Sequence, residues 1–483
     1  MLIPSDGADA ATSGVCGDGV AWEFDSDSQT LFITYTGSGT GKMDNHNNPT
    51  KYEFYPQADG INKVIIGEGV TSIGHYAFYD YSLQSVTLSS TVEETGIASF
   101  YGNNLTEIDL KNVTIIGEAA LGGNKLTSIV IPQTVKVIGD YSFKRCIDLA
   151  SVEFSDSPSV FYIGTDAFDQ TSLSEFCVPA TVTFLGSGMI GNSEVDYIDV
   201  DPANEYYVSV DGVVYTKDMK TLTHYPPKKV SSLYEIPDTV TEIGAGAFSS
   251  CLYISGVSIP DSVTIINKEA FSKCESMTDV VMSTAVTEIG EHAFYNCLMM
   301  NDIDLSKCTA LKSIGQQAFS ECSCIKKVNI PASVESIGER AFCFCKSLES
   351  FSVDPSNKYY RSVDGALYDK DMKVLIQYPN ASAQTSFTVP SGVEIIGQNA
   401  FSLCWNLNTL VFPDSVTTLS NPVVIDHGQS TSPITKLVFG KGLTTVGSKP
   451  FTHHHFFESK DSTEELPPTA DISGDTHSWA RLR

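Results

Sequence analysis

The chain has 483 residues, of which 58 are acidic and 30 basic, so its formal net charge is −28 and its pI is about 4.5. Apolar residues make up 42% and charged residues 18%, a balance typical of a folded protein and too apolar for a disordered one. The acidity argues against a nucleic-acid partner, whose phosphates need a basic surface, and the sequence lacks the run of about 18 apolar residues that a transmembrane helix requires.

The first 60 residues divide into a flexible start and a predicted cap. Residues 1–15 show no basic segment followed by an apolar one, so no secretory leader is visible, and we expect this stretch to be flexible. Residues 20–24 and 31–35 alternate apolar and polar side chains around a polar turn, a pattern typical of a β-hairpin. Because a stack of repeats exposes apolar edges at its ends, we expect residues 16–60 to form an N-terminal β cap.

A repeat of about 23 residues fills most of the chain from residue 61 to residue 451. Its frame is L-x-x-I-x-I-P-x-x-V-x-x-I-G-x-x-A-F-x-x-C, as in residues 254–274 and 325–345. The phenylalanine of the frame, here called the Phe position, recurs fourteen times, in most cases 21 to 25 residues apart. The residues at this position are Phe78, Phe100, Leu121, Phe143, Phe168, Ile190, Phe248, Phe271, Phe294, Phe319, Phe342, Phe401, Val424 and Phe451.

Each part of the frame predicts a structural role. The L-x-x-I-x-I segment ends in the two-residue period of a short strand with one buried face, and the proline removes a ladder donor and ends that strand. The V-x-x-I-G segment turns the chain back, where glycine supplies a backbone conformation that side chains resist. The phenylalanine fills the core on the far side. Since one unit cannot bury its own apolar side, the sequence predicts a leucine-rich-repeat type solenoid, mainly β with short turns or 3-10 segments, and a parallel sheet on its concave face.

Two longer steps interrupt the repeat. The segments near 198–230 and 351–385 match each other 153 residues apart, each with an Asp-Gly, an aliphatic-aromatic run, a Lys-Asp-Met-Lys turn and a second run ending in Tyr-Pro. We interpret each as a β-hairpin inserted between two repeats, and the constant offset indicates duplication of a block of repeats. Residues 452–483 leave the repeat pattern, and their polar composition predicts a disordered tail.

The chain resembles the BspA-like leucine-rich repeat surface proteins over about residues 14–451. The resemblance rests on the I-P-x-x-V-x-x-I-G-x-x-A-F-x-x-C frame, on the D-P-x-N-x-x-Y-x-S-V-D-G-x-L-Y insert and on the N-terminal pair Cys16-Gly17 followed by Trp22. It implies a location at the cell surface or outside the cell and a role in adhesion to host or matrix molecules. It carries no catalytic residue. The chain departs from the family pattern where Phe is replaced, at Leu121, Ile190 and Val424.

A series of cysteines and asparagines lies three residues after the Phe position, here called the Phe+3 position. Both residue types are compact and can satisfy buried backbone groups, so we interpret the series as a buried stack. Metal binding is disfavoured because side chains that run parallel along one axis do not converge on an ion, and parallel Cβ vectors disfavour disulfides. The residues are Asn103, Asn124, Cys146, Cys251, Cys274, Cys297, Cys322, Cys345 and Cys404.

Two further motifs suggest chemistry and are better explained as loops. The side chains of His453, His454 and His455 diverge from one another, which argues against metal chelation. Gly37–Lys42 resembles a phosphate-binding loop, but Thr36 stands where the first glycine belongs. The sequence therefore predicts no catalytic residue, no metal site and no cofactor.

Two sets of residues remain as a candidate binding face for a protein partner. Variable positions on the strand face are acidic, and such a face is either simply solvated or attracts a basic or calcium-bridged partner. Paired tyrosines in the inserts either pack the hairpin onto the solenoid or form a binding patch, since exposed tyrosine buries much area at a low entropy cost. The candidate residues are Glu107, Asp109, Glu153, Asp279, Asp302, Asp304, Tyr206, Tyr207, Tyr359 and Tyr360.

Three functions are compatible with these patterns. The leading hypothesis is a non-catalytic module for protein binding or adhesion, exposed at the cell surface and recognising a host, matrix or surface component. The second is a structural spacer or stalk without a ligand of its own. The third is a polysaccharide hydrolase that uses Asp302 and Asp304 on one strand face, which is disfavoured because nothing in the pattern shapes a pocket. Neither nucleic-acid binding nor membrane insertion is expected.

Overall fold

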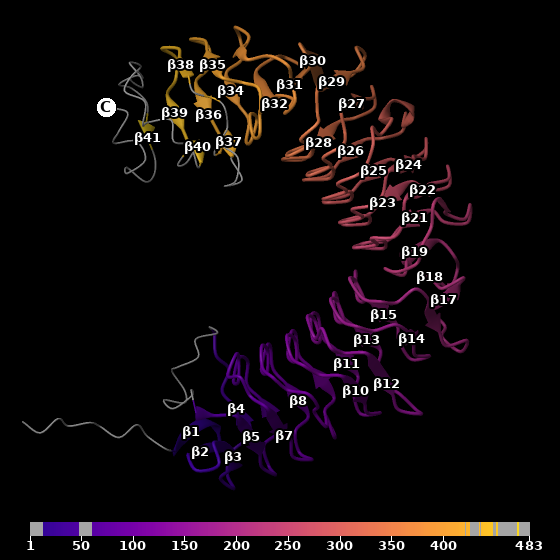
Figure 1. Cartoon of the computed structure of the whole chain (residues 1–483), viewed down its shortest axis with the longest axis vertical. Helices are drawn as coiled ribbons and strands as arrows, with labels where there is room; N and C mark the ends of the chain where they lie inside the picture. Colours follow the sequence, from indigo (N-terminus) through magenta and orange to yellow (C-terminus); the bar gives the residue numbers. More distant parts are fainter. Residues whose placement is uncertain are drawn as a thin grey trace, which may run out of the picture. The chain divides into compact units, whose positions relative to one another are not determined.

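The structure is a computed structural model, and it describes residues 13–47, 60–420, 422–425, 434, 436–447, 451–452 and 471–472. The chain divides into two compact units, Met1–Lys229 and Val230–Arg483 (Figure 1). In both units the described residues form short strands and turns stacked repeat upon repeat, which confirms the predicted leucine-rich-repeat solenoid. The flexibility and disorder predicted for the chain ends concern residues that are mostly outside the described part.

The first unit begins with antiparallel strands that pass into parallel ones. The four strands, in the spatial order β4-β1-β2-β3, are β1 (Ser13–Asp18), β2 (Val20–Asp25), β3 (Thr30–Tyr35) and β4 (Lys42–Met43). β3 then pairs in parallel with β5 (Lys63–Ile66), and β4 pairs in parallel with β6 (Ser72–Ile73). The antiparallel strands therefore offer two edges, and a column of repeat strands grows from each.

Each repeat of the first unit places residues in both columns. The I-x-I-P segments supply the long-strand column, which contains β5, β7 (Ser85–Thr87), β10 (Ser128–Ile131), β12 (Ser151–Phe154), β14 (Phe176–Val178) and β16 (Ile198–Val200). The V-x-x-I segments supply the short-strand column, which contains β6, β8 (Glu94–Thr95), β9 (Ile115–Ile116), β11 (Val137–Ile138), β13 (Tyr162–Ile163) and β15 (Phe184–Leu185). The sequence predicted only the first column. The second exists because the residue before the conserved isoleucine is also extended and points outward, while the isoleucine itself is buried.

The A-F-x-x-C segment forms the third side of each repeat, here called the turn column. Residues two before and two after the Phe position have positive φ, as at Tyr76 and Asp80, both at 57°. The N–H groups of Tyr76, Phe78 and Asp80 each donate to a carbonyl of the following repeat at 2.8 Å. The same three bonds recur between later repeats in both units. Every inter-repeat hydrogen bond of this kind therefore runs from the N–H of one repeat to the carbonyl of the next.

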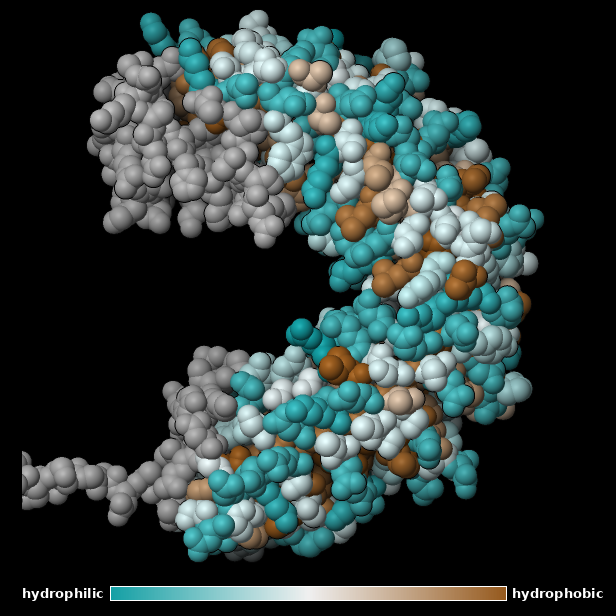
Figure 2. Space-filling model, in the orientation of Figure 1, coloured by the Kyte–Doolittle hydropathy of each residue, from teal (hydrophilic) through white to brown (hydrophobic). Residues whose placement is uncertain are grey.

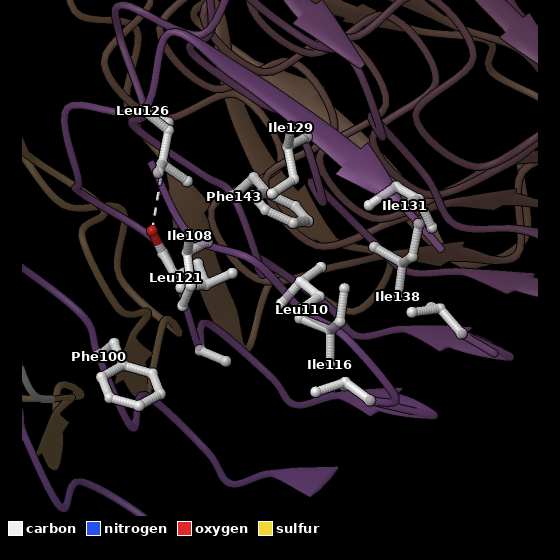
Figure 3. Close-up of a cluster of buried hydrophobic side chains, with 14 of the residues drawn as sticks. Phe100, Ile108, Leu110, Ile116, Leu121, Leu126, Ile129, Ile131, Ile138 and Phe143 are labelled. Atoms are coloured by element: carbon white, nitrogen blue, oxygen red, sulfur yellow. Dashed lines mark hydrogen bonds between the residues drawn. The ribbon is translucent and has the colours of Figure 1, made fainter. Parts of the chain in front are cut away.

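The core of the first unit is a continuous apolar column enclosed by the three sides (Figure 3). In Figure 3, Phe100, Leu121 and Phe143 come from successive turn segments, and Ile131 of the long-strand column lies next to Ile138 of the short-strand column. All five side chains are buried. Their burial supplies the main stabilisation of the stack, at roughly 25 cal/mol for each Å² of apolar surface removed from water.

Rings at neighbouring Phe positions stack face to face. In the first unit the ring centroids of Phe78 and Phe100 are 5.3 Å apart, and those of Phe143 and Phe168 are 5.2 Å apart. In the second unit an unbroken series of five rings stacks at 4.7 to 5.4 Å, formed by Phe248, Phe271, Phe294, Phe319 and Phe342. Each such pair contributes about 0.5–1.5 kcal/mol beyond the area that it buries.

The second unit repeats the two-column design. Its long-strand column contains β20 (Tyr234–Glu235), β22 (Gly256–Ser258), β24 (Asp279–Val281), β27 (Lys327–Ile330), β29 (Ser350–Val353), β33 (Ser386–Thr388), β35 (Thr409–Phe412) and β38 (Lys436–Phe439). Its short-strand column contains β21 (Glu242–Ile243), β23 (Ile265–Ile266), β25 (Glu288–Ile289), β26 (Ser313–Ile314), β28 (Ser336–Ile337), β34 (Ile395–Ile396), β36 (Thr418–Leu419), β39 (Thr445–Val446) and β41 (Asp471–Ile472). The remaining elements are the 3-10 helix η2 (Leu305–Lys307) and the parallel pair β37 (Val424–Ile425) and β40 (Phe451–Thr452).

Both inserts contain the predicted hairpin and one additional strand. The first consists of β17 (Tyr207–Val210), β18 (Val213–Thr216) and β19 (Thr221–His224), and the second of β30 (Tyr360–Val363), β31 (Ala366–Asp369) and β32 (Val374–Gln377), all antiparallel. The extra strand precedes the Asp-Gly pair. Asp211 and Gly212 have φ of 52° and 77°, and Asp364 and Gly365 have 51° and 79°, as a two-residue type I′ turn requires.

The glycine of V-x-x-I-G is explained by a close contact, so the prediction of a special backbone conformation is wrong there. Gly315 and Gly338 lie outside the left-handed region. A Cβ on Gly315 would lie 2.5 Å from the backbone nitrogen of Glu291 in the preceding repeat, and one on Gly338 would lie 2.3 Å from that of Gln316. The close approach of neighbouring repeats at this corner therefore favours glycine, although Asn267 and Ser420 occupy the position in two other repeats. Positive φ falls instead on residues of the turn column, most of which are not glycine.

Candidate interaction surfaces

In seven repeats the Phe+3 position supplies a hydrogen-bond donor to a buried carbonyl of the preceding repeat, whereas Cys251 and Cys404 contact a carbonyl of their own repeat. Cys274 Sγ donates to Phe248 O at 3.0 Å, and Cys297 Sγ donates to Phe271 O at 3.1 Å. Asn103 Nδ2 makes the equivalent bond at 2.8 Å. The prediction that this position satisfies buried backbone groups is therefore confirmed.

Asparagine and cysteine are nevertheless not equivalent at this position, because asparagine also accepts a hydrogen bond from the loop of the preceding repeat. Where that loop is short, its apolar residue comes two positions after the Phe+3 position, and the amide of this residue donates to the asparagine of the next repeat: Leu83 N donates to Asn103 Oδ1 at 2.9 Å, and Leu105 N donates to Asn124 Oδ1 at 3.2 Å. In the cysteine repeats the apolar residue comes three positions later, and Leu149 N donates back to Cys146 O at 3.0 Å. The short loop of one repeat is thus served by an acceptor in the next repeat, which an amide provides and a thiol provides only weakly.

The cysteine series provides no reactive centre. All twelve cysteines lie among the described residues and all are free thiols. Burial raises the pKa of Cys146 and of Cys343 to about 12, so both remain protonated at neutral pH. Cys177 on β14 differs from the other cysteines because its side chain is exposed. Within the described ranges no group of three or more His, Cys, Asp or Glu side chains could hold a metal ion, and the histidine run at 453–455 lies outside those ranges.

The acidic candidates occupy several kinds of position. Glu153 lies in β12 and Asp279 in β24, and both are exposed on a long-strand column. Glu107 and Asp109 are also exposed, but their segment is not a strand. The ten candidate residues divide between the two units, so the prediction of a single face remains a prediction.

Asp302 and Asp304 are engaged in local structure, and the prediction that they share a strand face is wrong. Both lie in the strand-free segment before η2. Asp302 Oδ1 accepts hydrogen bonds from the backbone nitrogens of Lys326 and Lys327 at 2.6 and 3.0 Å. Asp304 caps η2, and hydrogen bonds from Ser306 lower the pKa of its carboxyl. These carboxylates fix the backbone, so charge reversal there would test folding as much as binding.

The paired tyrosines split into one inward and one outward side chain in each insert. Tyr207 is buried, and its hydroxyl accepts from Leu185 N at 3.2 Å; Tyr360 is half-buried, and its hydroxyl accepts from Ile337 N at 2.9 Å. Tyr206 is 51% exposed and Tyr359 47% exposed. Only the first tyrosine of each pair is therefore available to a partner.

A buried asparagine imposes this split. Asn204 Nδ2 donates to the carbonyls of Pro179 and Val182 at 2.8 and 3.0 Å, while its Oδ1 accepts from the backbone nitrogens of Tyr206 and Tyr207, both at 2.8 Å. The corresponding bonds recur around Asn357 in the second insert. The matching D-P-x-N-x-Y-Y residues of the two inserts are thus explained by packing onto the preceding repeat.

The sequence reasoning missed a surface on the short-strand column of the first unit. The outward residues of β9, β11, β13 and β15 lie side by side in parallel register and are all apolar or aromatic. We call them the outer apolar ladder: Ile115, Val137, Tyr162 and Phe184. The available signal was the residue immediately before the isoleucine in V-x-x-I-G, which is polar in most other repeats.

The family of the chain follows from its repeats. The family model of the BspA type leucine-rich repeat region matches residues 50–158, 232–363 and 378–466, in six copies, which together cover more than half of the chain. The chain belongs to this family. The frame of the BspA-type repeat accordingly matches the two strand columns and the turn column described above.

Several solved structures are similar to the chain. A leucine-rich cell surface protein from Faecalibacterium prausnitzii A2-165 is 21% identical, with 89% of this chain and 96% of that chain covered and a TM-score of 0.48. The pneumococcal vaccine antigen PcpA is 17% identical, with 90% and 94% covered and a TM-score of 0.49. A leucine-rich repeat protein from Eubacterium ventriosum ATCC 27560 is 20% identical, with 95% and 92% covered and a TM-score of 0.42.

No curated protein sequence matches this BspA-type chain. Among its described residues, no helix has both the length and the hydrophobicity of a membrane span.

Proposed function

We propose that the chain is a non-catalytic module for protein binding or adhesion that acts at the outer surface of a cell. The observation that carries the proposal is that core-facing and outward-facing side chains occupy separate positions within the repeat. The side chains at the Phe and Phe+3 positions face the core, where they stack or bond to the backbone, while outward positions of the strand columns, such as the paired Val130 and Glu153, vary from repeat to repeat. Such a surface can be adapted to a partner without disturbing the fold. Membership of the BspA-type family supports the same conclusion.

The outward surface is mainly hydrophilic, with separate apolar patches (Figure 2). Exposed carboxylates such as Glu107 and Glu153, together with a net charge of −28, favour a partner with a basic surface and faster association at low ionic strength. Tyr206 and Tyr359 add amphipathic contacts of the kind that protein interfaces use.

Two experiments test the proposal. Protease treatment and impermeant labelling of intact producing cells should reach the chain, and a chain protected inside intact cells would overturn the surface location. The purified full chain should then bind at least one member of a panel of extracellular-matrix proteins in biolayer interferometry. Binding to no member of the panel would favour a spacer without a ligand.

Variants can then locate the binding. Glu107→Lys with Glu153→Lys reverses two exposed charges whose carboxylates make no hydrogen bond within the part of the chain that the structure describes, and should slow association several-fold at low salt. Lys63→Glu is a matched control on β5 of the same column, and because it adds negative charge it should leave association with a basic partner unchanged or faster. Equal association rates for the wild type and the double variant would place the interaction elsewhere on the chain.

A further inference from the structure

We propose that the outer apolar ladder, together with the exposed Phe161 that directly precedes Tyr162 in the chain, docks a segment of a partner protein that carries large apolar side chains flanked by basic ones. This inference rests on the proposed protein-binding function and names a surface and a partner chemistry for it. It concerns the first unit alone.

The ladder departs from the usual chemistry of its position. Five consecutive strands of the second unit, β21, β23, β25, β26 and β28, have mainly polar residues at the same outward position: Glu242, Ile265, Glu288, Ser313 and Ser336. The solenoid therefore forms without an apolar ladder at this corner. Four successive apolar residues in the first unit are not required by the stacking of the repeats, so their presence needs another explanation.

The ladder has the extent of a short peptide. Its four strands are paired in register, Ile115 with Val137, Val137 with Tyr162, and Tyr162 with Phe184. Neighbouring strands lie about 4.8 Å apart, so the ladder extends for about 14 Å, the length of roughly four extended residues. Ile115 is 37% exposed, Phe184 45% and Phe161 44%. Contiguous exposed apolar side chains of this kind mark interaction sites more often than isolated ones do.

The orientation of the aromatic rings favours apolar side chains over sugars as the occupant. The rings of Tyr162 and Phe184 stack with centroids 4.7 Å apart and planes within 7° of each other. The Tyr162 hydroxyl donates to Asp140 Oδ1 at 3.1 Å, which holds the ring in this position. The stacked faces cover each other, and Val137 is the register neighbour on the other side of Tyr162, so the pair presents ring edges and the outer face of Phe184. A sugar ring needs an open aromatic face, whereas aliphatic and aromatic side chains pack against edges.

The charges around the ladder select a basic partner. Glu94 on β8 pairs in register with Ile115, and Glu118 and Asp140 come two residues after the ends of β9 and β11. Lys136 is the exposed basic residue that directly precedes β11. A second copy of this chain would bring another net charge of −28 to the interface, which argues against self-association. An apolar segment flanked by Lys or Arg complements both the ladder and its carboxylates.

Selection from a peptide library tests the inference with the full chain. A phage-displayed library of random twelve-residue peptides would be selected on the immobilised wild type and counter-selected on the variant Phe161→Thr with Phe184→Thr. Threonine is a conservative choice because Thr114 and Thr183 occupy the Phe161 position in nearby repeats. The matched control is Val281→Thr with Met299→Thr, which removes two side chains of the second unit that are 56% and 52% exposed. Circular dichroism would show that each variant is folded.

We expect enriched peptides to combine large apolar residues with Lys or Arg. Their affinity should fall at least tenfold on the Phe161→Thr, Phe184→Thr chain and stay within twofold on the control. Glu94→Lys with Glu118→Lys leaves the ladder intact and should weaken the same peptides several-fold at low salt, which keeps the inference testable if the first variant is poorly folded.

The opposite results separate the inference from the function on which it rests. Peptides that bind the wild type and the Phe161→Thr, Phe184→Thr chain within twofold overturn the ladder site but leave protein binding intact. Binding on a glycan array that this variant loses, without any ladder-dependent peptide, overturns it in favour of a carbohydrate. A full chain that selects no peptide and binds no matrix protein contradicts the proposed function itself.

Discussion

Replacement of Asn103 by cysteine tests why the Phe+3 position differs between repeats. Cysteine occupies this position in seven other repeats, so residue frequency alone suggests a harmless change. The structure predicts the opposite, because Asn103 Oδ1 accepts from Leu83 N at 2.9 Å while its Nδ2 donates to the carbonyls of Phe78 and Phe100 at 2.8 and 2.9 Å. A thiol can replace one donated bond but leaves the buried N–H of Leu83 without its acceptor.

The expected magnitudes follow from these contacts. Asn103→Cys leaves one buried donor unpaired, which costs about 1–3 kcal/mol. Asn103→Ala also leaves the carbonyl of Phe78 without its partner, so it should cost about 2–5 kcal/mol. The carbonyl of Phe100 retains the bond from Asn124 Nδ2 at 2.9 Å in both variants. Asn104→Ala is the matched control, because the bond of the Asn104 side chain to Ser82 O is exposed and long, at 3.4 Å, and the change should cost less than about 0.5 kcal/mol.

Native-state amide hydrogen exchange is the suitable assay, because a repeat protein loses structure locally and a single unfolding free energy does not describe it. Exchange in peptides covering residues 78–124 should accelerate in the order Asn104→Ala, Asn103→Cys, Asn103→Ala. Protection in Asn103→Cys equal to the wild type, or lower than in Asn103→Ala, would refute the link between loop length and the need for an acceptor.

Three other predictions concern protons, thiols and close packing. Burial lowers the pKa of His224 to about 4. Between pH 6.5 and 4, His224 is therefore protonated in the unfolded state but not in the folded state. The first unit should therefore lose about 1.4 kcal/mol of stability per pH unit in that interval, and His224→Gln, which copies Gln377 of the second insert, should flatten this dependence in exchange measured from pH 7 to 4.5; an unchanged slope would contradict the assignment. Of the twelve thiols, Ellman's reagent should modify Cys177 first in the native chain and the half-buried Cys324 more slowly, and rapid reaction of further thiols would contradict their burial. Because burial and then Asp199 raise the pKa of Cys177, its reaction should continue to accelerate above pH 9. Gly315→Ala should destabilise its repeats by about 1–3 kcal/mol in urea unfolding, and a neutral result would show that the neighbouring backbone can yield.

The fold could be predicted from the sequence because its signal is repeated. The spacing of the Phe positions and the I-x-I-P segments predicted a stack of parallel strands, and the Asp-Gly pairs predicted the inserted hairpins. The second strand column was missed because two-residue strands such as Val137–Ile138 are too short to show alternation on their own. The glycine of V-x-x-I-G was misinterpreted because two different needs favour glycine: a backbone conformation that other residues resist, and a close approach that leaves no room for a Cβ atom.

The candidate surface was harder to predict, because exposure depends on contacts between repeats. Tyr206 and Tyr207 are identical in the sequence, and only the bonds to Asn204 decide which of them faces outward. Asp302 is an acidic residue of the kind expected in a binding face, yet its carboxylate accepts hydrogen bonds from the backbone amides of Lys326 and Lys327, which are more than twenty residues away in the sequence. To predict the outer apolar ladder, one would have to know the register between strands of four different repeats.

The one-way hydrogen bonds of the turn column have a consequence for synthesis. The first of these bonds runs from the backbone nitrogen of His46 to the carbonyl of His75 at 3.2 Å. From there on, the turn-column N–H groups of each repeat find their acceptors in the repeat that follows. The ribosome releases repeats in the same order. We therefore expect each newly synthesised repeat to accept the hydrogen bonds of the repeat before it and to present its own unpaired N–H groups to the repeat that follows. Limited proteolysis of ribosome-arrested chains of increasing length should show protection advancing one repeat behind the newest. Protection that arrives only when a whole unit is complete would contradict this stepwise growth.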